Sequence, residues 1–287
     1  MGKSTNSLER IVEHYTANDQ SSLKKEFQQL KKYHFNILDG LFTDREHPVF
    51  NELHNLMNEL AERLAKPATL NYDFDYDQIV SFGEILSTKI VSHYINSNGS
   101  KAEWKDVRRC IKTNETYREG RVNWTLTEDL MKKEFQFGKV QFLVTQGFLG
   151  STINDMTTTL GREGSDYSAA IIAYIMRAEK VVIWKDVPGV LNADPKWFDE
   201  TVLLNQLSYL DAIELAYYGA SVIHPKTIKP LQNRNINLYV KSFVDPSAEG
   251  TVIGNLNYDK LVPSFIFKMD QVLVRISPTD FSFIDED

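Results

Sequence analysis

The chain has 287 residues, of which 42% are hydrophobic, enough for one large domain or two smaller ones with buried cores. Its formal net charge is −7, from 32 basic and 39 acidic residues, which argues against a general nucleic-acid or anionic-membrane binder. The single cysteine, Cys110, excludes an internal disulfide and suits a reducing compartment. The first residues lack a signal-peptide pattern and no apolar run is long enough to span a bilayer, so we expect a cytoplasmic protein.

About the first seventy residues are predicted to be mostly helical. Apolar side chains recur at helical spacing over residues 8–15, 23–30 and 50–64. Pro67 is expected to end the third of these helices. Another helix is expected within residues 79–95, with Ser81-Phe82-Gly83-Glu84 leading into it. A helical beginning is unusual for an α/β enzyme, which commonly starts with a strand.

Strands and helices are predicted to alternate farther along the chain. Short strands are expected at residues 104–112 and 122–124, and buried strands at 139–145, 181–184 and 236–240. A helix over residues 207–218 is expected to end at Gly219. This alternation predicts an α/β fold whose mainly parallel sheet is covered on both faces, with ligands at the carboxyl ends of its strands.

The glycine-containing loop at residues 157–168 is the strongest candidate for a ligand site. Gly161 and Gly164 bracket Arg162, so backbone N–H groups and a guanidinium can meet a carboxylate or a phosphate. Ser165 is expected to cap the following helix, and Asp166 to lie in its first turn, where the helix dipole favours a negative charge. The alternative is a tight turn beside a solvated arginine.

Three other polar stretches are candidate sites, each with a purely structural alternative. Glu84 can bind a substrate ammonium or only stabilise the start of a helix. The backbone of the loop at residues 185–196 can hydrogen-bond to the edge of an adenine, and Lys196 can bind a phosphate. The alternative is an ordinary loop between a strand and a helix. Lys226 places a positive charge at the start of a helix, where the helix dipole disfavours it. Either a bound anion compensates this charge, or Lys226 is an ordinary surface lysine. No His or Cys spacing predicts a metal site.

These stretches together resemble the aspartate kinases of the amino-acid-kinase superfamily over nearly the whole chain. The resembling motifs are Met1-Gly2-Lys3-Ser4-Thr5-Asn6, Ser81-Phe82-Gly83-Glu84, Gly147-Phe148-Leu149-Gly150, residues 158–169, Asp186-Val187-Pro188-Gly189-Val190, Asp194-Pro195 and His224-Pro225-Lys226-Thr227. The resemblance implies a three-layer αβα sandwich with a mainly parallel central sheet. It also implies that ATP, with Mg²⁺ carried on the nucleotide, phosphorylates the side-chain carboxylate of L-aspartate to 4-phospho-L-aspartate, the first step toward lysine, threonine and methionine.

The resemblance also implies roles for individual residues. Glu84 would bind the substrate ammonium and Arg162 the α-carboxylate, with Thr5 and Ser165 also at the substrate. Asp166 and Lys226 would be the catalytic residues. The residues expected at the nucleotide are Lys185, Asp186, Val187, Leu191, Lys196 and Lys226.

The chain departs from the pattern of the resembling family at both ends. The family's Lys-Phe-Gly-Gly-Thr-Ser strand, which binds the transferring phosphate, has no counterpart, and only the first strand of the family's ACT regulatory region is expected, at residues 271–276. We therefore expect an incomplete catalytic domain at residues 1–250, and a linker with an incomplete regulatory domain at residues 251–287. The chain as given is expected to be inactive or impaired, since the phosphate-binding group contributes much of the rate.

Lesser departures and two alternatives complete the prediction. Lys185 stands where the family frequently has threonine or serine. Glu163 stands where glycine is frequent, and Leu191 where an aromatic residue is common. One alternative is a non-catalytic remnant that binds aspartate or a nucleotide and joins an intact subunit. The other is a sister kinase acting on glutamate, acetylglutamate or a nucleotide, against which the Ser81-Phe82-Gly83-Glu84 motif argues. The expected partners are L-aspartate and ATP, without nucleic acid or membrane, and a homodimer is left open.

Overall fold

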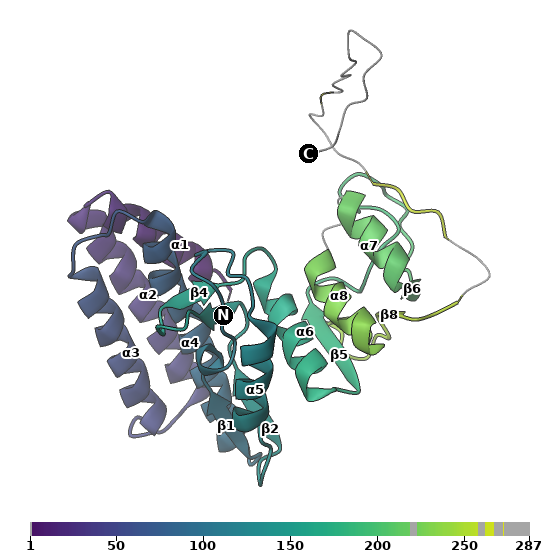
Figure 1. Cartoon of the computed structure of the whole chain (residues 1–287). Helices are drawn as coiled ribbons and strands as arrows, with labels where there is room; N and C mark the ends of the chain where they lie inside the picture. The colour runs from purple at the N-terminus through teal and green to yellow at the C-terminus, as the bar shows by residue number, and fades with distance from the viewer. Residues whose placement is uncertain (1, 219–222, 258–261, 267–271, 273–287) are drawn as a thin grey trace.

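A computed structural model describes residues 2–218, 223–257, 262–266 and 272. Helices dominate the N-terminal part of the chain, and an α/β arrangement follows it (Figure 1). The predicted α/β class is confirmed. The described residues contain three sheets, in the orders β1-β2, β3-β4 and β5-β7-β8-β6.

The N-terminal part consists of α1 (Ser4–Thr16), α2 (Gln20–Leu41), α3 (Pro48–Leu64) and α4 (Tyr72–Ser97). Their apolar faces pack together, and the predicted helical residues Leu8, Leu53 and Leu60 are fully buried. Asp19 caps α2 by accepting a hydrogen bond from the backbone N–H of Ser22 at 3.1 Å. The three helices expected before residue 70 are thereby confirmed.

Helix α4 begins much earlier than the sequence analysis predicted. The Asn71 side chain caps it by accepting a hydrogen bond from the N–H of Phe74 at 3.1 Å. Ser81-Phe82-Gly83-Glu84 therefore lies inside the helix, and Glu84 is not a first-turn residue that serves the helix dipole. The prediction failed because residues 72–78 are rich in acidic and aromatic side chains and show no clear apolar period.

The middle of the chain forms short elements: β1 (Ala102–Lys105), a 3₁₀ turn (Val107–Arg109), α5 (Trp124–Glu134), β2 (Phe142–Thr145), β3 (Leu149–Ser151) and β4 (Thr157–Thr159). The strand expected at residues 122–124 is absent, because Asn123 caps α5 and Trp124 is its first residue. The buried strand expected at residues 139–145 is shorter, and its Phe142 is 47% exposed. Strands β1 and β2 pair in parallel, whereas β3 and β4 are antiparallel.

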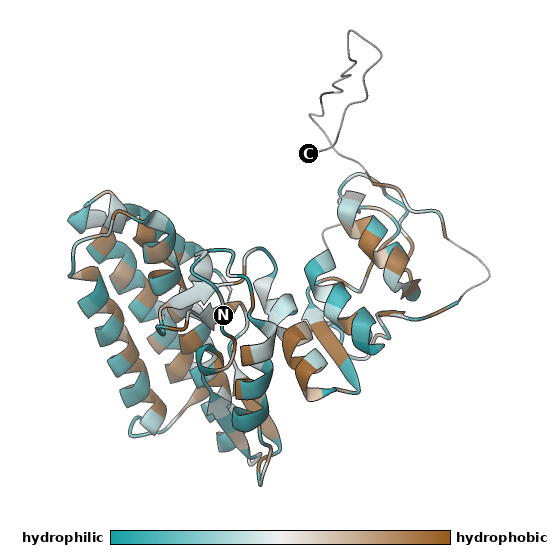
Figure 2. Cartoon of the chain, in the orientation of Figure 1, coloured by the Kyte–Doolittle hydropathy of each residue, from teal (hydrophilic) through white to brown (hydrophobic). Residues whose placement is uncertain are grey.

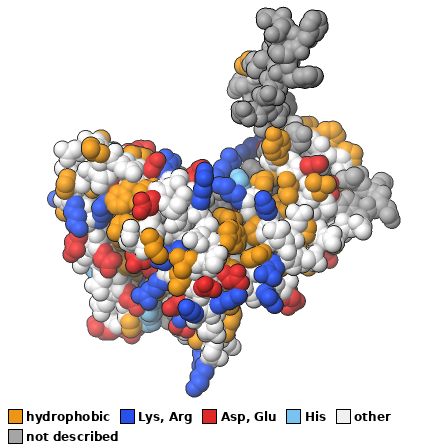
Figure 3. Space-filling view, viewed as in Figure 1, with side chains coloured by type: hydrophobic (Ala, Val, Ile, Leu, Met, Phe, Trp, Pro, Cys, Tyr) orange, Lys and Arg blue, Asp and Glu red, His pale blue; other side chains and the backbone are white. Residues whose placement is uncertain are grey.

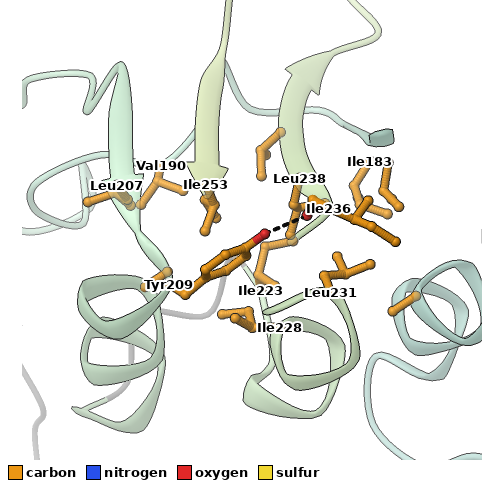
Figure 4. Close-up of a cluster of buried hydrophobic side chains, with 14 of the residues drawn as sticks. Ile183, Val190, Leu207, Tyr209, Ile223, Ile228, Leu231, Ile236, Leu238 and Ile253 are labelled. Atoms are coloured by element: carbon orange, nitrogen blue, oxygen red, sulfur yellow. Dashed lines mark hydrogen bonds between the residues drawn. The ribbon is translucent and has the colours of Figure 1, made fainter. Parts of the chain in front are cut away.

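The C-terminal part contains α6 (Gly164–Met176), β5 (Lys180–Lys185), β6 (Gln206–Ser208), α7 (Tyr209–Tyr218), α8 (Pro225–Arg234), β7 (Asn237–Ser242) and β8 (Thr251–Gly254). Strand β5 pairs in parallel with β7 and β6 with β8, while β7 and β8 are antiparallel. Apolar side chains from these strands and from α7 and α8 form the core of this part (Figure 4). Within it the Tyr209 hydroxyl donates to the Ile236 carbonyl at 2.7 Å.

Strand β8 changes the expected division of the chain. The sequence analysis placed residues 251–287 in a linker and a second domain, whereas β8 is an interior strand of the four-stranded sheet. The first residues of that range thus belong to the same sheet as β7. Gly219, expected to end a helix, and most of the strand expected at residues 271–276 lie outside the described residues.

Helix α6 joins the two parts of the molecule. Its Ala170 and Ala173 belong to the core of the C-terminal sheet, whereas its Ile171 and Ile175 belong to the core around β3 and α5. Figure 2 shows hydrophobic residues on α6 and along β5, between the two parts. The helix is therefore buried on two sides, which explains the nearly continuous apolar run from Ala169 to Met176.

Candidate functional site

A cavity of about 740 Å³ lies where α1, α4 and the start of α6 meet. The residues expected at the substrate, Thr5, Glu84, Arg162 and Ser165, all line it. They come from three segments far apart in the sequence, and the fold brings together residues that the family resemblance had assigned to one substrate. This is the candidate site.

Glu84 provides a carboxylate from the interior of α4. Burial raises the pKa of Glu84, because desolvation disfavours its charged form. Thr5, in the first turn of α1, lines the same cavity. A ligand ammonium beside this carboxylate would restore the charged form that burial disfavours.

The turn between β4 and α6 presents Arg162 to the cavity. Gly161 has φ +80°, a left-handed conformation that favours glycine, and the Gly164 N–H donates to the Gly161 carbonyl at 3.0 Å. Helix α6 begins at Gly164 with Glu163 in the N-cap position, so the prediction that Ser165 caps the helix is wrong. Asp166 lies in the first turn, as predicted.

The loop between β2 and β3 packs directly on this turn. A Cβ added to Gly147 would lie 2.8 Å from the Ser165 Cβ, so only glycine allows this approach. The Phe148 N–H donates to the Ser168 hydroxyl at 2.9 Å, and that hydroxyl donates to the Gly164 carbonyl at 3.0 Å. These contacts fix where Ser165 enters the cavity.

Asp77 of α4 organises another wall of the cavity, a role that the sequence analysis missed. Its carboxylate accepts hydrogen bonds from the Arg118 N–H at 2.8 Å, the Thr159 N–H at 2.9 Å and the Thr159 hydroxyl at 2.8 Å. Burial raises the pKa of Asp77 to about 6. The helix thereby positions both β4 and the loop that carries Arg118.

Arg118 is a second basic residue of the cavity that sequence reasoning did not find. It lines the cavity, its guanidinium lies 4.5 Å from the centre of the Tyr76 ring, and it pairs with Asp73 at 3.5 Å. Its φ of 65° is left-handed. In the sequence it belongs to a polar loop with no distinguishing motif, so only the tertiary contacts identify it.

Asp166 and Lys185, predicted as a catalytic and a nucleotide-binding residue, are brought together. The Lys185 ammonium donates to the Asp166 carboxylate at 2.8 Å, and their side chains are 25% and 13% exposed. Lys185 ends β5, and its carbonyl accepts a hydrogen bond from the Phe243 N–H at 2.9 Å. The pair links the start of α6 to the carboxyl end of the sheet.

The other residues expected at the nucleotide follow the end of β5. Asp186, Val187 and Lys196 are exposed, and Leu191 is half-buried. The loop is anchored where the Val190 N–H donates to the Thr251 hydroxyl at 2.8 Å, and the Lys196 N–H donates to Asp194 at 2.9 Å. None of these residues is among those that line the 740 Å³ cavity.

Lys226 lies in a different place from the other predicted residues. It lines a separate groove of about 550 Å³ between α5, α6 and α8, together with the aromatic residues Trp124, Tyr167 and Tyr174. His224 precedes it and caps α8, accepting a hydrogen bond from the Lys226 N–H at 3.1 Å. No other residue predicted for the substrate or the nucleotide lines this groove.

The described part of the chain offers neither a metal centre nor a membrane-spanning helix. No group of three or more His, Cys, Asp or Glu side chains there is placed to hold a metal ion. Among the same residues, no helix combines the length and the apolar character that crossing a membrane requires. Basic and acidic side chains are interspersed over the face seen in Figure 3.

Comparison with known proteins identifies a family. Residues 7–242 match the model of the amino acid kinase family. The chain is 32% identical over 294 residues to the maize (Zea mays) chloroplastic bifunctional aspartokinase/homoserine dehydrogenase 2, covering 97% of this chain and 31% of that protein. It is 36% identical over 180 residues to the lysine-sensitive aspartokinase 3 of Escherichia coli K12, covering 62% of this chain and 40% of that protein. The chain thus spans well under half the length of these relatives.

Solved structures extend the likeness to three dimensions. The structure of E. coli aspartokinase III in complex with aspartate and ADP, in the R-state, superposes with a TM-score of 0.83 at 28% identity, covering 90% of this chain and 57% of that chain. The T-state complex of the same enzyme with lysine and aspartate gives a TM-score of 0.79. The fold around the cavity is therefore that of an aspartokinase.

Proposed function

The chain belongs to the amino acid kinase family, and from this premise we propose that it is an aspartate kinase, which transfers the γ-phosphoryl group of ATP to the side-chain carboxylate of L-aspartate. The observation that carries the proposal is the shared cavity, in which Glu84 and Arg162 offer a carboxylate and a guanidinium to one ligand. An α-amino acid has the complementary pair of charges. The likeness to an enzyme solved with aspartate and ADP supports the same substrates.

The proposed roles at the substrate follow from charge. Glu84 binds the ammonium, and Arg162 binds the α-carboxylate through its planar donor fork. Ser165 and Thr5 contribute hydroxyl groups from the starts of α6 and α1. With both ends of the amino acid held, the side-chain carboxylate is directed toward the nucleotide, and such positioning is a large part of phosphoryl-transfer catalysis.

The proposed nucleotide site is the loop after β5. Asp186, Val187 and Leu191 would contact the adenosine, and Lys196 the phosphates. Lys185, held by Asp166 at 2.8 Å, would direct its ammonium toward the transferring phosphate. We propose that Mg²⁺ arrives on the nucleotide, since phosphate oxygens are its preferred ligands in kinase sites. The place of Lys226 in a separate groove makes it the weakest member of the predicted set.

The activity of the whole protein is part of the proposal, since the chain spans only part of the relatives it matches. The product, 4-phospho-L-aspartate, would lead toward lysine, threonine and methionine. We propose a cytoplasmic location because the chain has a single cysteine. We propose a homodimer because of the family resemblance.

Calorimetric binding beside an assay of ADP release tests the proposal. We expect L-aspartate and ADP each to bind, and Arg162→Ala to weaken L-aspartate binding by roughly 10- to 100-fold, because a charged hydrogen-bond partner is lost. Arg121→Ala is the matched control, since Arg121 is exposed and does not line the cavity. Failure of L-aspartate to bind would overturn the assignment, and binding without turnover would favour the non-catalytic remnant.

A further inference from the structure

We propose that Glu163 is a second carboxylate for the substrate ammonium and so determines selectivity for substrates with a free, charged α-amine. The inference rests on the proposed function, because it concerns the same cavity. It goes beyond the family resemblance, since the family frequently has glycine at this position and the resemblance implies no role for it.

The backbone of Glu163 is in a conformation that a glutamate rarely adopts. Its φ of 52° and ψ of 31° are left-handed, and its side chain does not cap α6. A residue with a Cβ is disfavoured there relative to glycine. Residues held in such conformations are found disproportionately at ligand sites, where surrounding contacts fix them. Arg162, Gly164 and Ser165 on either side all line the cavity with Glu163.

Among the residues that the structure describes, one carboxylate oxygen of Glu163 is buried without a hydrogen-bond donor beside it. Its Oε2 atom is buried and accepts no hydrogen bond within the described part of the chain. A buried carboxylate oxygen without a donor is unfavourable, because the lost hydration is not replaced. The side chain of Glu163 is only partly buried and lines the cavity, so a rotation that turns this oxygen toward the cavity would let a bound cationic group supply that donor and the opposite charge.

The charges around the cavity indicate which cation fits. Glu84, Glu119 and Glu163 line the cavity together with the basic side chain of Arg162, whereas Asp73 is paired with Arg118 at 3.5 Å. These carboxylates, beside the guanidinium groups of Arg118 and Arg162, match an amino acid that carries both an ammonium and carboxylates. They disfavour a dicarboxylate that lacks the amine, because its carboxylates would lie beside the carboxylates of the cavity with no ammonium to compensate their charge.

The test is a cycle of two ligands and two proteins, measured by isothermal titration calorimetry. L-Aspartate and succinate, which has both carboxylates but no ammonium, are titrated into the wild-type chain and into Glu163→Gln. We expect the variant to lose roughly tenfold in affinity for L-aspartate and to keep or gain affinity for succinate. Glu115→Gln is the matched control, because Glu115 is exposed and outside the cavity, and it should leave both affinities unchanged.

The outcomes separate this inference from the proposed function. If the wild-type chain binds L-aspartate and Glu163→Gln changes both affinities equally, the role of Glu163 is refuted while the kinase assignment stands. If the wild-type chain does not bind L-aspartate, the proposed function itself fails. Glu163→Gly, which suits the left-handed backbone, should show the same loss of discrimination, and retained discrimination in this variant would also overturn the inference.

Discussion

At the scale of single residues, Asp77 shows how a buried acid organises a site that it does not enter. It is fully buried in α4, yet it accepts hydrogen bonds from Arg118 and Thr159, which line the cavity. Its burial raises its pKa from 3.8 to about 6 despite those donors. The wall of the cavity therefore depends on a group that titrates close to neutral pH.

The raised pKa of Asp77 predicts a pH dependence of stability. The folded state binds a proton more tightly than the unfolded state, so this stabilisation is complete below about pH 3.8 and is lost as the pH rises through about 6. Between pH 5 and pH 7.5 it should decline by about 1 kcal/mol. Urea denaturation of wild type and Asp77→Asn at both pH values measures it. An equal pH response in the two proteins would contradict the prediction.

Gly147 provides a second prediction at this scale. An alanine methyl would lie 2.8 Å from the Ser165 Cβ, and the start of α6 would have to move. Gly147→Ala should weaken L-aspartate binding by roughly tenfold, because the displaced Ser165 and Arg162 line the proposed substrate cavity. Gly138→Ala is a useful comparison, since no atom lies within 4 Å of its added Cβ, although its φ of +50° adds strain. Unchanged binding by Gly147→Ala would show that the turn tolerates the shift.

At the scale of secondary-structure elements, α4 and α6 carry most of the site. Helix α4 supplies Glu84 and Asp77 from its interior, and Asp75 at its start is tied to α3 by an ion pair with Arg63. Helix α6 supplies the residues at its N-terminus and packs against both cores. The cavity is therefore positioned by the interior of α4 and by the start of α6, a helix that packing against both cores holds in place.

The ion pair between α3 and α4 is expected to be important for folding. Asp75 is fully buried, and it also accepts hydrogen bonds from the Thr69 N–H at 2.7 Å and from the Thr69 hydroxyl at 2.9 Å. Asp75→Ala should destabilise the chain by about 3 kcal/mol, since the Arg63 guanidinium would lose its partner in a partly buried place. Chemical denaturation measures this, with the exposed Asp129→Ala as the control. A loss below 1 kcal/mol would mean that water replaces the carboxylate.

The shared packing of α6 predicts coupling between the two parts. Ile171 is fully buried in the core around β3 and α5, while the neighbouring Ala170 is fully buried in the other core. Ile171→Ala should cost about 3 kcal/mol of unfolding free energy. Hydrogen exchange should become faster in β3 and also in β7, because both strands belong to cores that include α6. Faster exchange in β3 alone would show that the parts unfold separately.

At the scale of the whole molecule, two of the sheets have edge strands with exposed apolar side chains, as far as the described residues show. Strand β5 is an edge of the four-stranded sheet, and within the described residues β2 pairs with β1 alone. Trp184 on β5 is 49% exposed and Phe142 on β2 is 47% exposed. Exposed edge strands with large apolar side chains favour association between molecules.

The exposed apolar side chains on these edge strands predict that the protein self-associates, and a charged side chain on β5 should reduce this association. Trp184→Lys places a cation on the edge strand, so sedimentation velocity should show a larger monomer fraction than for wild type at the same concentration. Val202→Lys, which removes an exposed apolar side chain outside the strands, is the control and should have little effect. If both variants behave alike, general surface hydrophobicity and not the edge causes the association.

The sequence alone determined the class of fold, and it predicted the substrate-site residues that line the cavity. The helical period of residues 8–15 and 50–64, the strand at residues 236–240, and the turn containing Arg162 depend on local patterns and backbone preferences, which act over a few residues. The same patterns led to two wrong predictions, the start of α4 and a strand at residues 122–124. In both places an asparagine cap, Asn71 or Asn123, decided the boundary.

Only the tertiary structure decided which residues share the cavity. Thr5, Glu84 and Arg162 are far apart in the chain, and no local pattern encodes their meeting. The roles of Asp77 and Arg118, the unpartnered Glu163 oxygen, and the separate groove of Lys226 likewise became visible only through packing. Burial and hydrogen bonding between distant segments set the charges of a site, whereas the sequence by itself fixes the residue types and the local elements that carry them.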